Sequence, residues 1–106
     1  AVRVFAAGVL ATDIRTGRES AQYENADISI EERRARAVFN LIGDDHGTKA
    51  QTAVRFCLAN PDIDVVNVGV FDISQLEEAV KAAEMGPLPD EAIRALDPLY
   101  AENFKI

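Results

Sequence analysis

The 106-residue sequence contains a single cysteine, Cys57, and a single histidine, His46. One cysteine excludes an internal disulfide bond and slightly favours a reducing compartment, so we expect a cytoplasmic protein. Metal sites built from cysteine and histidine need several such ligands at short spacings, and no such spacing occurs here. We therefore predict no metal centre.

Long apolar runs are also missing, and no stretch approaches the roughly 20 residues that a membrane-spanning helix needs. Basic residues are outnumbered, because 18 acidic against 11 basic side chains give a net charge of −7. An acidic surface repels the phosphates of nucleic acids and anionic lipids, so neither nucleic acid nor membrane is an expected partner. The 48% share of hydrophobic residues is typical of a globular protein, and the length allows one domain at most.

Three helices are predicted from pairs of residues that have the spacing of a capping box. These pairs are Ser29 with Glu32, Thr48 with Gln51, and Ser74 with Glu77. The helices are expected to end at Gly43, at Asn60–Pro61 and at Gly86–Pro87. A shorter helical tail follows from Asp90.

Each of these helices has apolar residues at the three- and four-residue spacing of a core-facing side. In the third helix the expected inner face is Leu76, Ala79, Val80 and Ala83. In the second helix the inner face includes Cys57, so this residue is expected to be part of the core rather than a nucleophile.

Two short strands are predicted, at residues 2–6 and 64–70, with a long polar loop over residues 12–27. Strands that alternate with helices favour a parallel α/β sheet. Two strands alone leave unpaired edges and an uncovered apolar face. We therefore expect the chain to form part of a larger α/β fold.

The second strand leads through Gly69 into the third helix. A glycine at the end of a strand lets a ligand approach the backbone, and a helix N-terminus favours a phosphate. The same arrangement is also a common structural turn between a strand and a helix. A ligand-binding role therefore depends on the neighbouring segments.

No convincing catalytic set is present. His46 follows Asp44 and Asp45 in a turn, where an exposed loop residue is a better interpretation than a carboxylate-oriented base. Tyr23 lies in the polar loop and Tyr100 in the terminal helix, so packing or hydrogen-bonding roles are expected for both. The residues themselves indicate a binding element without catalytic residues.

Four segments together resemble the C-terminal third of an aldo-keto reductase: AAGVLAT, GTKAQTAVRFCLANPDIDVVNVGV, ISQLEEA and GPLPDEAIRALDPLYA. The resemblance covers nearly the whole chain, residues 1–106, as one segment. It implies the last two parallel strands of a (β/α)8 barrel, their helices and a tail helix, with the N-terminal remainder of the barrel as a partner. It also implies hydride transfer between a nicotinamide and an aldehyde, ketone or sugar lactol, with the catalytic residues outside this chain.

The resemblance implies two groups of cofactor-binding residues. The first group, along the pyrophosphate, is Ala7, Gly8, Val9 and Leu10. The second group, at the adenosine end, is Gly69, Val70, Phe71, Asp72, Gln75, Glu78 and Ala79. Family members often have Arg, Lys or Ser in place of Phe71 and usually Asn in place of Ala79. These two departures weaken the preference for NADP over NAD that the resemblance implies, since a phenyl ring forms no charge-assisted bond to a phosphate.

Two other functions remain open on the sequence. The chain is alternatively a non-enzymatic α/β interaction module that buries its edges by self-association. It is also compatible with another barrel, or with a doubly wound nucleotide-binding protein that shares only the strand–glycine–helix unit. The last alternative leaves the match over residues 48–61 unexplained.

Overall fold

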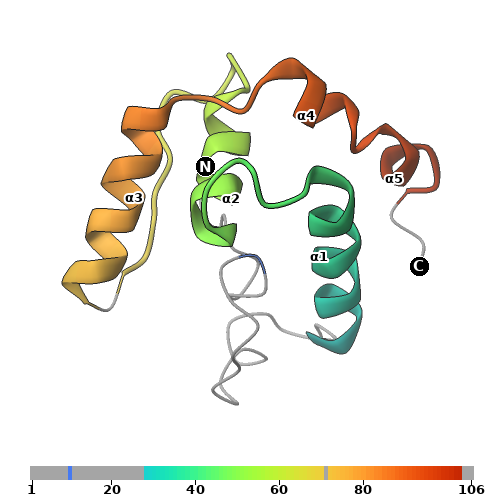
Figure 1. Cartoon of the computed structure of the whole chain (residues 1–106), viewed down its shortest axis with the longest axis horizontal. Helices are drawn as coiled ribbons and strands as arrows, with labels where there is room; N and C mark the ends of the chain where they lie inside the picture. Colours follow the sequence, from blue (N-terminus) through green and yellow to red (C-terminus); the bar gives the residue numbers. More distant parts are fainter. Residues whose placement is uncertain (1–9, 11–27, 71, 104–106) are drawn as a thin grey trace.

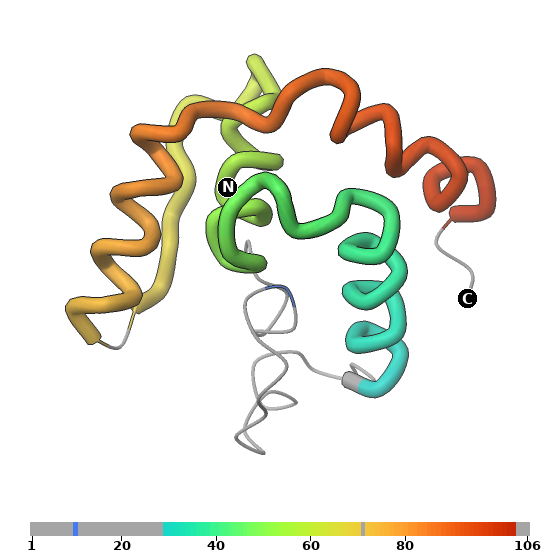
Figure 2. Tube along the Cα trace, viewed as in Figure 1, coloured from blue at the N-terminus to red at the C-terminus, as the bar shows by residue number. Residues whose placement is uncertain are grey.

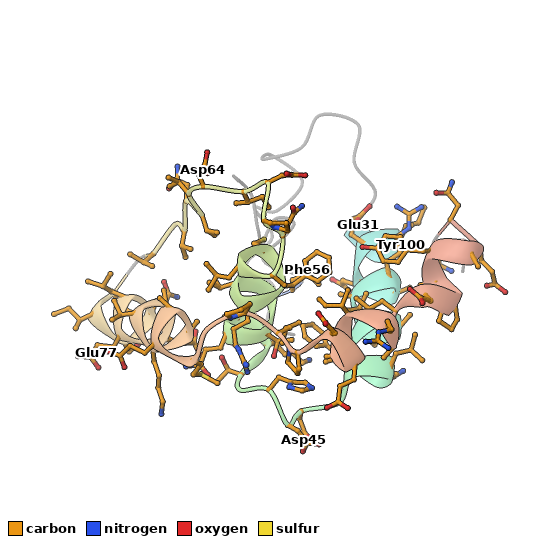
Figure 3. The ribbon with its side chains drawn as sticks, turned by 90° about the horizontal axis from the view of Figure 1, so that it is seen from above. Glu31, Asp45, Phe56, Asp64, Glu77 and Tyr100 are labelled. Atoms are coloured by element: carbon orange, nitrogen blue, oxygen red, sulfur yellow. The ribbon has the colours of Figure 1, made fainter. Side chains whose placement is uncertain are left out.

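The computed structural model describes residue 10, residues 28–70 and residues 72–103 (Figure 1). Five helices lie in this part of the chain: α1 (Ile28–Ile42), α2 (Lys49–Leu58), α3 (Ile73–Met85), α4 (Asp90–Arg94) and α5 (Asp97–Ala101). Helices account for 63% of the described residues, and none of these residues is in a strand. Helix α2 lies between α3 on one side and α1 on the other (Figures 1 and 3).

The sequence predicts an α/β fold, the C-terminal portion of a (β/α)8 barrel with two parallel strands. This prediction is wrong for the described residues, which form a small all-helical arrangement. The first expected strand, residues 2–6, lies outside the described residues. The second, residues 64–70, is irregular backbone that joins α2 to α3. Its valines favour extended backbone, but a strand also needs a neighbour with which to form a hydrogen-bonded ladder. No described segment provides that ladder.

Helix α2 begins with the expected capping box. The Thr48 hydroxyl accepts a hydrogen bond from the Gln51 backbone N–H at 3.1 Å, and the Thr48 N–H donates to the Gln51 side-chain oxygen at 3.0 Å. The helix ends at Leu58, just before the expected Asn60–Pro61 stop. Because each of these signals acts within a few residues, the sequence predicts this helix well.

Helix α3 begins two residues before the expected start. Asp72 is its N-cap and accepts from the Gln75 N–H at 2.9 Å, so the expected capping role of Ser74 is wrong. The helix ends at Met85, and Gly86 follows with a positive φ of 83°, as the glycine signal predicts.

The face that α3 buries also differs from the expectation. Ala82 is fully buried, whereas Leu76 and Val80 are 51% and 52% exposed. The side-chain amide of Gln51 donates to the Glu78 carbonyl at 3.3 Å and so holds this side of α3 toward α2. Orientation against a neighbouring helix, rather than apolar spacing alone, therefore decides which face is covered.

Helix α1 begins at Ile28, one residue before Ser29, which was expected to cap it. Ala35 is buried, and Phe39 on the same side is half-buried. The turn after α1 begins at Gly43, whose N–H donates to the Phe39 carbonyl at 2.8 Å and whose φ is 81°. Across this turn the Lys49 ammonium lies 5.5 Å from the centre of the Phe39 ring, a cation–π contact between α1 and α2.

The buried apolar residues of the described chain are few and mostly small: Ala35, Ala50, Ala53, Val54, Ala82, Leu88, Ala92 and Leu96. Alanine buries little surface, so this core provides modest hydrophobic stabilisation. The tube in Figure 2 shows α3 at one end of the arrangement, away from α1, α4 and α5. No helix in the described residues is long and apolar enough to cross a bilayer.

Candidate functional site

The two expected groups of cofactor-binding residues are described to different extents. Ala7, Gly8, Val9 and Phe71 lie outside the described residues. Leu10 is a half-buried turn residue. The rest of the second group, by contrast, lies at the beginning of α3, where its geometry is defined.

Gly69 lies just before α3 and is exposed. A Cβ atom added at this glycine meets no other atom within 4 Å. Val70, the next residue, is 39% exposed. The chain at Gly69 and Val70 is therefore exposed, and the space beside the Gly69 Cα is empty.

Asp72 controls the electrostatics of this helix end. Its carboxylate accepts hydrogen bonds from the Gln75 N–H at 2.9 Å and from the Ser74 hydroxyl at 2.7 Å. These bonds, the Gln75 backbone bond first, lower the pKa of the Asp72 carboxyl. The N-terminus of α3 therefore already carries a negative charge of its own, and any bound phosphate has to share this end with it.

The remaining expected residues follow on the first turns of α3. Gln75 is exposed, and Glu78 and Ala79 are half-buried. The Glu78 backbone is held by Gln51 of α2, so the position of this turn is fixed relative to α2. The described residues of the second group therefore lie together within residues 69–79. The ionisable residues among them, Asp72 and Glu78, are acidic.

Arg55 is a structural residue that the sequence gives no reason to single out. Its guanidinium donates to three backbone carbonyls: Gly86 at 2.8 Å, His46 at 2.9 Å and Pro87 at 3.2 Å. Its own carbonyl accepts from the Leu88 N–H at 3.1 Å. Arg55 therefore joins the turn before α2 to the segment after α3. Since all three guanidinium nitrogens are engaged with the protein itself, Arg55 is a poor candidate for binding a phosphate.

The other candidate residues offer little chemistry. Burial raises the pKa of the half-buried Cys57 thiol, which disfavours the nucleophilic thiolate. His46 is half-buried, and its carbonyl is one of the three acceptors for Arg55. Among the described residues, no three His, Cys, Asp or Glu side chains gather as a metal site requires.

In comparisons with known proteins, no family model, curated protein or solved structure matches this chain. The likeness to aldo-keto reductases therefore stays a prediction that depends on the sequence motifs themselves.

Proposed function

We propose that this chain is a dinucleotide-binding segment of an NAD(P)-dependent oxidoreductase of the aldo-keto reductase type. The observation that carries the proposal is the open backbone at Gly69 leading directly into the capped N-terminus of α3. The complete enzyme, located in the cytoplasm, transfers hydride between a nicotinamide and an aldehyde, ketone or sugar lactol. Its catalytic residues come from a part of the polypeptide other than these 106 residues, and this segment positions the adenosine half of the cofactor.

The capping carboxylate favours NAD as the cofactor. A carboxylate near the adenosine ribose accepts hydrogen bonds from the ribose hydroxyls of NAD, whereas it repels the 2′-phosphate of NADP. Asp72 is exposed and lies next to the position proposed for that ribose. The charge of Asp72 thus acts against the NADP preference that the family resemblance by itself implies.

The proposal predicts that Gly69→Val weakens NAD⁺ binding at least tenfold, because the added side chain occupies the space through which the cofactor approaches. The unbound fold is expected to be unaffected, since this space is empty. Asn67→Val is the matched control, an exposed position on the same segment that receives the same side chain. Binding is measured by ¹⁵N–¹H NMR titration with NAD⁺, which detects weak affinity and locates it. Perturbed resonances away from residues 69–79, or equal losses in the two variants, would contradict the proposed site.

A second prediction concerns the choice of cofactor. Asp72→Asn retains a good N-cap but removes the negative charge, so we expect the affinity for NADP⁺ relative to NAD⁺ to rise severalfold. Asp64→Asn makes the same charge change at another exposed position and controls for the overall charge. The ratio of the two dissociation constants is the measured quantity. An unchanged ratio in Asp72→Asn would place the ribose away from this carboxylate.

A non-enzymatic interaction module is the second candidate function. It is supported by the large apolar residues that the described chain leaves exposed, which include Ile73 at 72% and Leu76 at 51%. Contiguous exposed apolar surface is typical of protein-binding sites. If the chain is only an interaction module, we expect no dinucleotide binding in the NMR titration.

A further inference from the structure

The outer side of α3 carries an apolar surface that no described element covers. Ile73, Leu76 and Val80, here called the α3 stripe, are 72%, 51% and 52% exposed. Their i, i+3, i+7 spacing places them on one side of the helix. Ala82, on the side toward α2, is fully buried, and Figures 1 and 2 show the outer side of α3 without a neighbouring helix.

One edge of the α3 stripe is lined by acidic residues. Glu77 follows Ile73 by four residues, and Glu84 follows Val80 by four, so each glutamate lies next to a stripe residue on the helix surface. Both glutamates are exposed, and Glu77 lies at the outer margin of the molecule (Figure 3). Lys81 lies between them, so the edge carries two negative charges against one positive charge.

We propose that the α3 stripe binds an amphipathic helix of a partner polypeptide, with apolar residues at helical spacing and lysine or arginine beside them. An apolar helix face of this kind is recognised through anchors at i, i+3 or i+4, and i+7. Basic residues on the partner complement Glu77 and Glu84 and speed association. A second copy of this chain fits less well, because it brings a further net charge of −7.

The test uses a synthetic helical peptide of about 18 residues, with leucines along one side and lysines elsewhere, labelled with fluorescein. Its binding to the full chain is followed by fluorescence anisotropy. Leu76→Ser is expected to weaken binding at least tenfold, because it removes the central anchor of the α3 stripe. Circular dichroism checks that the variant, altered only at an exposed position, keeps its helix content.

A charge swap tests the acidic edge. Glu77→Lys/Glu84→Lys is expected to weaken binding of the lysine peptide at least fivefold and to strengthen binding of the same peptide with glutamates in place of lysines. Asp62→Lys/Glu102→Lys makes an equal charge change at exposed positions outside α3 and is the matched control.

Three results would overturn the proposal. The first is binding of the lysine peptide by Leu76→Ser that is as tight as by the unchanged chain. The second is a loss of binding in Asp62→Lys/Glu102→Lys that equals the loss in Glu77→Lys/Glu84→Lys, which would indicate that the basic peptide is attracted to any acidic surface. The third is a dimer in sedimentation velocity that Leu76→Ser dissociates, which would make a second copy the occupant. Dinucleotide binding at residues 69–79 is measured separately, and its failure leaves this proposal unaffected.

Discussion

Replacing Arg55 with methionine is expected to lower the free energy of unfolding by about 3 kcal/mol. Hydrogen bonds to charged groups contribute about 1.5–3 kcal/mol each when buried and less when exposed. The bonds to Gly86 and His46 are partly buried, whereas the bond to Pro87 is exposed. Because small domains are stable by only about 5–15 kcal/mol, this loss is a large fraction of the total. Urea denaturation followed by circular dichroism measures it.

Two further variants show whether the loss comes from the guanidinium geometry. Arg94→Met removes the same charge and side-chain length from an exposed position on α4 and is expected to change stability by less than about 0.5 kcal/mol. Arg55→Lys keeps the charge but lacks the planar fork that reaches several carbonyls at once, so it should be intermediate. A cost for Arg55→Met that equals the cost for Arg94→Met would show that the three hydrogen bonds add nothing to stability.

Some of the signals that act within one turn of helix were predicted correctly, although Ser29 lies inside α1 and Asp72 rather than Ser74 caps α3. The Thr48–Gln51 capping box joins residues three apart, and both of its hydrogen bonds are formed. Gly43 and Gly86 end their helices with a positive φ, a backbone conformation that glycine adopts without strain. Such features need no knowledge of the rest of the fold, because the residues that make them are already neighbours in the chain.

Features that depend on distant neighbours were predicted poorly. Residues 64–70 have the composition of a strand, but a strand exists only when another segment pairs with it. The apolar side of α3 was expected to face inward, whereas Gln51 holds the Glu78 side of that helix toward α2. Arg55 reaches carbonyls about 30 residues further along the chain, which no local pattern indicates.

The candidate site also combines features that were predictable from the sequence with one that was not. Gly69, Asp72 and Gln75 are close in sequence, so their grouping at the start of α3 was predictable. The identity of the N-cap was not, since Asp72–Gln75 and Ser74–Glu77 offer competing capping pairs two residues apart. The structure selects Asp72, and this places a carboxylate where the family resemblance implies a phosphate site. The proposed preference for NAD over NADP therefore depends on an N-cap that lies two residues earlier than expected.

Replacing Gly47 with alanine is expected to lower the free energy of unfolding by about 2–4 kcal/mol, the largest effect expected for adding one methyl group at any of the described glycines. Gly47 has a φ of 108°, which side-chain-bearing residues rarely adopt and which costs roughly 1–2 kcal/mol. The added Cβ also lies 2.6 Å from the Gln51 side-chain oxygen and 3.0 Å from the Met85 methyl carbon. The Gln51 oxygen is the acceptor for the Thr48 N–H, so relief of this clash breaks the capping box, worth about 1 kcal/mol.

Gly43→Ala is the matched control for this variant. Gly43 also has a positive φ, 81°, but a Cβ atom there meets nothing within 4 Å, so its substitution reports backbone strain alone. The excess cost of Gly47→Ala over Gly43→Ala in thermal or urea unfolding then measures the contact with Gln51. Because Gln51 also donates to the Glu78 carbonyl, faster hydrogen exchange at the Thr48 amide and shifted resonances at Glu78 should accompany the loss. Equal costs in the two variants would mean that Gln51 moves aside freely and that the capping box contributes little to holding α3 against α2.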